Sequence, residues 1–179
     1  VIMTRNPNLM KGKSERIATY EHFSFKKGDV LSEKFVRGDY SHFIHSATDA
    51  SADLNEKNPL KMFDTILQGT RWALEFARKN SIQHTLMMSS GAVYGQQPSD
   101  LGQVSESWYG GPACNDPRSA YAEGKRSAEM LSAIYAKQFG VTVTTARIFA
   151  LLGPYLPLDI HFAAGNFIRD ALSNREIVI

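Results

Sequence analysis

Tyr121 and Lys125 have the side chains and the spacing of a proton-transfer pair. Residues four positions apart on a helix lie on the same face, one turn from each other. A lysine ammonium beside a phenol stabilises the phenolate, so it should lower the pKa of the tyrosine from about 10. Tyr121 would then be a candidate acid/base near neutral pH. Tyrosine and lysine also meet at this spacing by chance on amphipathic helices, so the pair alone leaves both interpretations open.

Ser90 is the second candidate, because it directly follows an apolar segment that is typical of a strand. It would lie at the carboxyl end of that strand, which is where open α/β sheets bind their ligands. A hydroxyl group at this position can form a hydrogen bond with a substrate alcohol or ketone. The alternative is that Ser89 and Ser90 are turn residues that satisfy backbone groups.

The segments that must position these groups alternate between strand and helix patterns. Two long helices are expected at 59–79, after the cap Asn58, and at 117–139, before Gly140. A third helix is expected at 161–173, and a long loop at 95–116. The expected strands are 1–5, 23–27, 42–47, 83–89, 141–149 and 176–179. This alternation predicts an α/β fold with a parallel sheet that is covered on both faces.

Composition excludes several classes of protein. The 179 residues suffice for one domain, and 43% hydrophobic and 21% charged residues are typical of a globular chain rather than a disordered, collagenous or coiled-coil one. The charged residues give a net charge of +2 and are scattered along the chain, which argues against a nucleic-acid partner. Cys114 permits no internal disulfide, and the histidines lack metal-ligand spacing. With no spanning apolar run and no signal peptide, we expect a cytoplasmic protein without a membrane partner.

The order of Ser90, Tyr121 and Lys125 resembles that of the extended short-chain dehydrogenase/reductases. More narrowly, it resembles the NAD-dependent epimerase/dehydratase group that acts on nucleotide sugars. This resemblance implies a Rossmann-type, doubly wound parallel sheet. Other segments that match the family in the same order are 25–30, 43–48, Gly69-Thr70, 146–149, Gly153-Pro154 and Asn166-Phe167.

The resemblance also implies a role for each matching residue. Tyr121 would exchange a proton with the sugar hydroxyl during hydride transfer at C4, while Ser90 holds the reacting oxygen and Asn166 contacts the substrate. Lys125 would bind the nicotinamide ribose. The other implied cofactor contacts, to NAD or NADP, are Arg5, Asp29, Val30, Ser46, Ala47, Thr48 and Phe149. Arg5 stands where many members have an aspartate, and an arginine there favours the 2′-phosphate of NADP; a solvated arginine explains it equally well.

Three departures from the family pattern limit the reaction. Gly91 and Ala92 replace the Asp-Glu pair of the 4,6-dehydratases, and the related decarboxylases also place a glutamate at the second position. Epimerisation needs neither group, and 4-keto reduction is the alternative. Ile66 and Ala150 each replace an asparagine of the family pattern, so the sequence does not determine which sugar is the substrate. A non-catalytic, cofactor-sensing module is a third possibility, although it has no need for Ser90, Tyr121 and Lys125 together.

The glycine-rich motif G-x-x-G-x-x-G is absent from the sequence. The family carries it after the first strand, where it binds the pyrophosphate. We therefore expect residues 1–179 to be a partial NAD(P)-binding domain, truncated at both ends, without the first βα unit and most of the C-terminal substrate region. The longer protein is called the parent enzyme below. The resemblance further implies a homodimer through helices 59–79 and 117–139.

Overall fold

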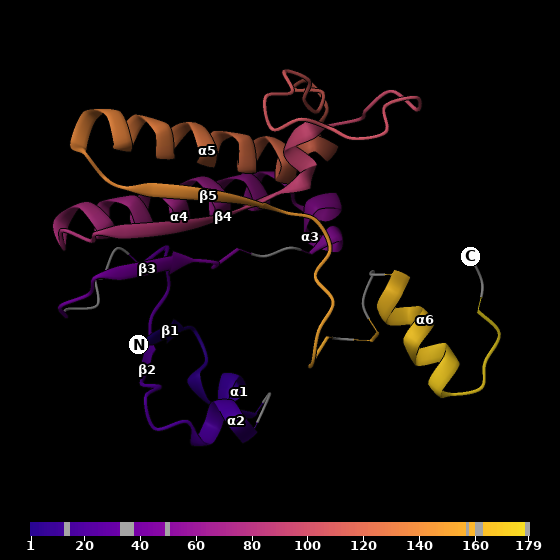
Figure 1. Ribbon diagram of the computed structural model, residues 1–179, viewed down its shortest axis with the longest axis horizontal. Coiled ribbons are helices and arrows are strands. Elements are labelled where there is room, and N and C mark those ends of the chain that lie inside the picture. The colour runs from indigo at the N-terminus through magenta and orange to yellow at the C-terminus, as the bar shows by residue number, and fades with distance from the viewer. Residues whose placement is uncertain (13–14, 33–37, 49–50, 157, 160–162, 178–179) are drawn as a thin grey trace.

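The computed structural model describes residues 1–12, 15–32, 38–48, 51–156, 158–159 and 163–177. Strands and helices alternate along the chain, as Figure 1 shows. The strands are β1 (Ile2–Thr4), β2 (Phe25–Lys27), β3 (His42–His45), β4 (His84–Ser90) and β5 (Val143–Ile148). The α-helices are α1 (Pro7–Gly12), α2 (Glu15–Thr19), α3 (Ala52–Lys57), α4 (Pro59–Lys79), α5 (Ala120–Phe139) and α6 (Ala163–Leu172), with 3₁₀ turns η1 (Gly91–Tyr94) and η2 (Pro117–Ser119).

The described strands form two separate parallel sheets. β1 pairs with β2, and β4 lies between β3 and β5. In the doubly wound order 3-2-1-4-5-6, these sheets correspond to strands 3-2 and strands 4-5-6. A cavity of about 490 Å³ lies between β1 and β3, lined by Ile2, Phe43, Ile44, Trp72 and Phe76 among others. The parallel α/β class is confirmed, and the cavity separates its two groups of strands.

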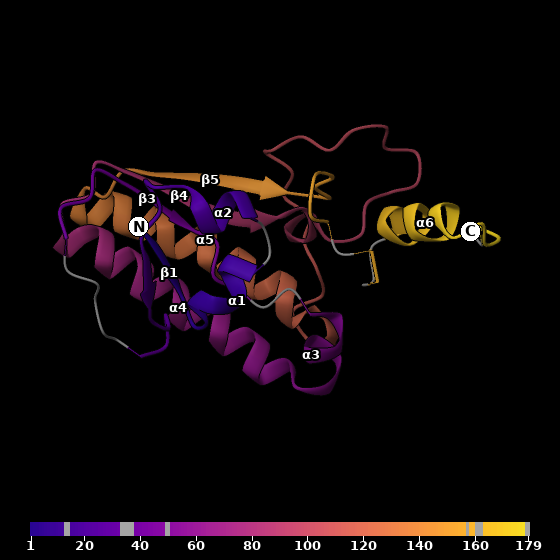
Figure 2. The same ribbon diagram turned by 90° about the horizontal axis from the view of Figure 1, so that it is seen from below.

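Both long helices lie on one face of the three-stranded sheet, as Figure 2 shows from below. The expectation that helices cover both faces of this three-stranded sheet is wrong for the described residues. The face opposite α4 and α5 is open, and Ile44 on β3 is 63% exposed. The reason is the direction of winding. The crossovers β3–α4–β4 and β4–α5–β5 step the same way along the sheet, and parallel crossovers are right-handed, so both helices reach the same side.

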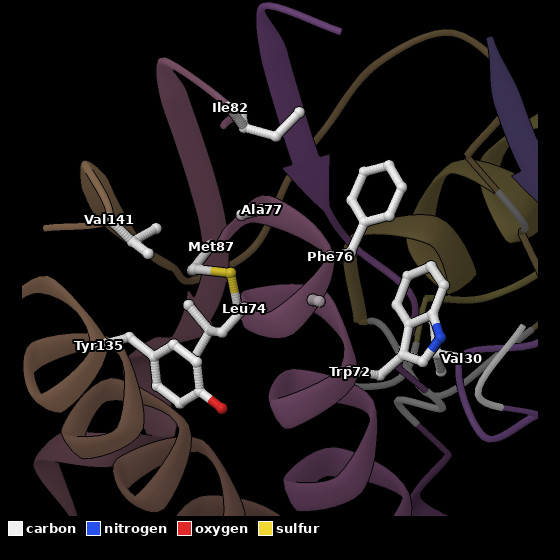
Figure 3. Close-up of a cluster of buried hydrophobic side chains, with 10 residues drawn as sticks. Val30, Trp72, Leu74, Phe76, Ala77, Ile82, Met87, Tyr135 and Val141 are labelled. Carbon is white, nitrogen blue, oxygen red and sulfur yellow. The ribbon is translucent and has the colours of Figure 1, made fainter. Parts of the chain in front are cut away.

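Helix α4 forms the centre of the core because it is apolar on two sides. Figure 3 shows Leu74 directed towards Met87 and Tyr135. Trp72 and Phe76 lie on the other side of the helix with their rings stacked, and Val30 lies next to Trp72. Leu74 is fully buried, and burial of a leucine side chain contributes roughly 1.5–3 kcal/mol to folding. The start of the helix is fixed by Asn58, whose side chain accepts a hydrogen bond from the Lys61 N–H. The cap fixes the start of α4, and its apolar faces pack the helix against the strands and against its neighbour α5.

Other predicted elements differ in length or are missing. The strand expected at 176–179 is wrong for residues 176–177, which are neither strand nor helix, while residues 178–179 lie outside the described residues. The third helix is confirmed as α6, and residues 161–162 of its expected range lie outside the described residues. The sequence analysis missed α3, although Ser51 caps it by accepting a hydrogen bond from the Leu54 N–H. The loop at 95–116 is confirmed, since no helix or strand interrupts it.

Gly95 starts this loop in a conformation that an alanine would strain. Its φ is +65°, and an added Cβ would lie 2.3 Å from the carbonyl carbon of Gly111. We expect Gly95→Ala to lower the free energy of unfolding by about 2–3 kcal/mol, measured by urea denaturation. Gly102→Ala in the same loop is the control, because nothing lies within 4 Å of its added Cβ. Equal midpoints for the two variants would contradict the strain argument.

Candidate active site

Lys125 joins three elements at the carboxyl end of the sheet. Its side chain enters from α5, and its Nζ donates to the Thr48 hydroxyl at 3.2 Å and to the Met88 carbonyl at 2.8 Å. The residue is only 5% exposed. Burial lowers the pKa of its ammonium from the ordinary 10.5 to about 8. Lys125 is therefore a buried cation that titrates close to the neutral range.

Tyr121 lies one turn earlier on the same face of α5. The Lys125 Nζ is 5.8 Å from the centre of the Tyr121 ring. The ring is half-buried, and its hydroxyl has no hydrogen-bond partner among the residues that the structure describes. The phenol is thus close to a cation and its oxygen is available to a ligand. The helical spacing predicted this geometry correctly.

Ser90 ends β4, two residues after the carbonyl group that Lys125 contacts. Its hydroxyl oxygen accepts a hydrogen bond from the Ala92 N–H at 3.2 Å and so caps η1. The position at the strand end is as predicted. The hydrogen bond is the local one that the turn interpretation expected. The Ser90 O–H donates to no acceptor within the described ranges, so it remains available to a ligand.

The floor beneath the tyrosine is apolar. An added Cβ at Gly124 would lie 3.0 Å from the Cδ1 of Ile66, so the glycine lets α4 and α5 approach closely. Ile66 is 1% exposed and packs with Met62 and Ala128, and Tyr121 lies against this group. Ile66 therefore supports helix α5 through packing, where the family pattern has an asparagine.

An aromatic stack covers the turn after β4. The rings of Tyr94 and Phe149 are 6.0 Å apart and nearly parallel, and the guanidinium carbon of Arg147 is 4.8 Å from the Tyr94 ring centre. An added Cβ at Gly91 would lie 2.5 Å from the Phe149 ring. An acidic side chain at position 91 would therefore displace Phe149, which explains in steric terms why glycine stands there.

A partly buried charge network, which was not predicted from the sequence, lies behind this stack. Arg147 on β5 makes two-pronged contact with Glu129 on α5, at 2.8 Å for the closest pair, and Ser89 donates to the same carboxylate at 2.6 Å. Burial raises the pKa of Glu129, but the hydrogen bonds from Arg147 and Ser89 outweigh it, so the pKa lies below its ordinary value. Arg147 also donates to the Glu106 carbonyl and so ties the long loop to β5. In the sequence, the residue that could have indicated this network is Glu129, which lies one helical turn after Lys125.

The predicted cofactor residues fall into two groups. Val30, Ser46 and Ala47 line the cavity between the two sheets. Val30 is also 8% exposed and packs against Gly69, so much of its side chain belongs to the core. Thr48 and Lys125 contact each other at the carboxyl ends of β3 and β4. Both groups follow strands that meet at the same end of the fold.

The remaining predicted residues lie apart from these groups. Asp29 follows β2, and its carboxylate accepts a hydrogen bond from the Leu31 N–H. Arg5 follows β1 and is exposed. Asn166 lies on α6, which stands away from the sheets in both views, and its Oδ1 accepts a hydrogen bond from Arg169 of the same helix. The structure does not bring Asn166 to Tyr121.

The donor set around Lys125 fits a ribose. Two of the three N–H groups of the ammonium bond Thr48 and Met88, which leaves one for a ligand within the described part of the chain. His45, 5% exposed on β3, stays neutral at pH 7, because burial and the charge of Lys125 lower its pKa to about 4. The spare N–H of the Lys125 ammonium, beside the Thr48 hydroxyl and the neutral His45 ring, is suited to bind the two hydroxyl groups of a ribose.

Metal-binding and membrane-spanning proteins have features that the described residues lack. Within the described ranges, no group of three or more His, Cys, Asp or Glu side chains could hold a metal ion. No described helix is long and apolar enough to cross a bilayer.

The parallel strands, joined through the crossover helices α4 and α5, define a parallel α/β domain. Comparison with known proteins is more specific: the chain belongs to the NAD dependent epimerase/dehydratase family, whose model matches residues 2–179. This confirms the resemblance found in the sequence and places the chain in a family of NAD-dependent enzymes.

Individual relatives agree with this assignment. The chain is 32% identical over 175 residues to UDP-glucuronic acid decarboxylase 1 of Xenopus tropicalis, covering 96% of this chain and 40% of the relative. A solved UDP-N-acetylglucosamine 4-epimerase from Methanobrevibacter ruminantium M1 is 25% identical, with a TM-score of 0.76 over 90% of this chain and 51% of that one. A UDP-glucuronic acid 4-epimerase from Bacillus cereus, at 22% identity and a TM-score of 0.78, shows the same fold over 99% of this chain and 55% of that one. The chain thus spans about half or less of these relatives.

Proposed function

We propose that this chain carries the acid/base group of an NAD(P)-dependent nucleotide-sugar enzyme that epimerises its substrate at C4. Tyr121 is the proton-transfer residue, Lys125 holds a ribose, and Ser90 holds the reacting oxygen. The observation that supports this most strongly is the buried Lys125 ammonium 5.8 Å from the centre of the Tyr121 ring, whose hydroxyl has no hydrogen-bond partner among the described residues. The substrate class follows from the relatives, which include UDP-sugar decarboxylases and epimerases.

Each residue has a part that its chemistry permits. The Tyr121 phenolate accepts the proton of the sugar hydroxyl at C4, and the same oxygen returns a proton when the opposite face has reacted. The Lys125 ammonium stabilises the phenolate while its spare N–H binds a ribose hydroxyl. The Ser90 O–H donates to the oxygen at C4 and keeps it in reach of Tyr121. The bound nicotinamide supplies the hydride chemistry.

The turn after β4 favours epimerisation over decarboxylation or dehydration. Ala92 has no proton-transfer group, and the added Cβ at Gly91 would meet the Phe149 ring at 2.5 Å. The usual acidic pair would therefore need a different side chain at 92 and a different place for Phe149. Epimerisation uses only Ser90, Tyr121 and Lys125.

The proposal extends to the cofactor and the assembly. Arg5, exposed after β1, favours NADP over NAD by charge alone. Exposed apolar residues on the two long helices, such as Leu60, Met130 and Ile134, support a homodimer through α4 and α5. We place the enzyme in the cytoplasm, with no nucleic-acid or membrane partner. The 4-keto-sugar reductase is the runner-up, and it uses the same three residues.

Incubation of the parent enzyme with UDP-glucuronic acid and either NADP or NAD tests the reaction directly. We expect a C4 epimer in the product analysis by NMR, with the carboxyl group retained. Release of carbon dioxide with formation of a UDP-pentose would contradict the role assigned to Ala92. Turnover only of 4-keto sugars with a reduced cofactor would favour the reductase, and cofactor binding without any turnover would favour the sensing module.

A further inference from the structure

Helix α5 begins without a side-chain cap of its own. The first N–H groups of a helix have no partner within it, and the N-cap side chain usually supplies one. Ser119 occupies the N-cap position of α5, but its side chain forms no capping hydrogen bond. The catalytic tyrosine is the second residue of this uncapped helix.

Asn55 supplies the missing partner from another helix. Its Oδ1 accepts a hydrogen bond from the Tyr121 N–H at 2.9 Å, and its Nδ2 donates to the Arg118 carbonyl at 2.8 Å. Both groups of one amide therefore hold the start of α5 from α3. Leu54, the neighbouring residue, packs with Ile66 and its partners on the same apolar floor as Tyr121.

The same part of the chain also contacts the lysine of the pair. Thr48, at the end of the segment after β3, accepts a hydrogen bond from Lys125, and Asn55 on the following helix holds Tyr121. The two contacts lie one turn apart on α5. They fix the depth and the rotation of the helix face that carries both side chains.

We propose that Asn55 is a positioning residue, which caps α5 from α3 and so sets the place of the Tyr121 phenol relative to the substrate. This inference rests on the proposed function of Tyr121. An ordinary stabilising cap would affect only folding, whereas a positioning cap affects turnover more than substrate binding, because a displacement of about 1 Å can lower a rate by about 100-fold.

Three variants separate these roles. Asn55→Leu removes both hydrogen bonds at a similar volume. Asn55→Asp keeps the oxygen acceptor for the Tyr121 N–H, and a carboxylate at a helix N-terminus is favourable. It also replaces the Nδ2 donor by an oxygen that faces the Arg118 carbonyl, so it restores only one of the two contacts. Asn58→Ala is the matched control, because Asn58 caps α4 by the same kind of bond, to the Lys61 N–H at 3.0 Å, without touching α5.

Amide hydrogen exchange in the parent enzyme tests the contact without any turnover. We expect Asn55→Leu to speed exchange at the Tyr121 N–H by at least about 10-fold, since the removed bond is its local protection. Asn58→Ala should leave that amide unchanged. Equal exchange at Tyr121 in the wild type and Asn55→Leu would overturn the proposal.

Steady-state kinetics with UDP-glucuronic acid and whichever of NADP and NAD supports turnover test the consequence. Asn55→Leu should lower kcat by about 10- to 100-fold with KM within about twofold, and Asn55→Asp, which keeps the bond to the Tyr121 N–H, should recover part of the loss. A loss in Asn55→Leu no larger than that of Asn58→Ala, or no recovery in Asn55→Asp, would overturn the positioning role. If the wild-type enzyme converts no nucleotide sugar, the proposed function fails, and the exchange measurement still decides whether Asn55 holds Tyr121.

Discussion

Tyr121→Phe lowers the turnover of the parent enzyme by about 10²- to 10⁴-fold, which is the usual contribution of one acid/base group. The substitution removes only the hydroxyl group, which has no partner among the described residues, so the fold should not change. Cofactor affinity should stay within about twofold, because Lys125 and Thr48 remain in place. Turnover by NMR and cofactor binding by calorimetry measure the two effects.

Tyr135→Phe is the matched control for this variant. Tyr135 lies on the same helix, is 6% exposed, and donates its hydroxyl to Glu75 at 2.8 Å, far along α5 from Lys125. Its loss should cost about 1 kcal/mol of stability and leave turnover within about twofold. Unaltered turnover in Tyr121→Phe would remove Tyr121 from the catalytic role and leave an α/β scaffold without an assigned reaction.

Lys125→Met should stabilise the domain at pH 7 while it abolishes activity. A pKa of about 8, against 10.5 when unfolded, means that the fold disfavours the ammonium form. At 1.36 kcal/mol per pKa unit the cost reaches roughly 3 kcal/mol, and the lost hydrogen bonds to Thr48 and Met88 offset part of it. We expect a net gain of about 1–2 kcal/mol in urea denaturation without cofactor.

The gain should disappear at high pH. Between pH 8 and 10.5 the unfolded chain still binds the Lys125 proton and the folded chain does not, so the stability of the wild type rises with pH. Below pH 8 the buried ammonium of Lys125 destabilises the fold by the full amount, and above pH 10.5 this destabilisation is gone. Lys57→Met is the control, since Lys57 is exposed and pairs only with Asp53 on α3, so its effect should be small at either pH. A variant less stable than the wild type at pH 7 would show that the bonds of Lys125 outweigh its burial.

The sequence predicted the long helices well because their signals are local. Asn58 and Pro59 start α4, Gly140 ends α5, and the four-residue spacing places Tyr121 beside Lys125. The short helix α3 was missed because its six residues carry no apolar period, although Ser51 is a readable cap. Its importance comes from Asn55, whose partners are 63 and 66 residues away in sequence.

Contacts between distant segments explain the residues whose roles the sequence did not determine. Ile66 and Gly91 depart from the family pattern, and the sequence around each position does not show the physical reason. The structure shows that each meets a partner from a distant segment, Ile66 at Gly124 and Gly91 at Phe149. Asn166 was assigned by position in the family pattern, and its place on α6, apart from the sheets, is a tertiary property that no local pattern records.

The two separate sheets have a consequence for the behaviour of the chain in concentrated solution. Among the described strands, β1 pairs only with β2 and β3 only with β4, so the sides that face the cavity offer unpaired backbone groups. Proteins usually blunt such strands with lysine, glutamate or proline, and neither Ile2–Thr4 nor His42–His45 contains one. Any preparation in which this cavity stays empty is therefore prone to aggregation through strand addition, and its solubility depends on what fills that space.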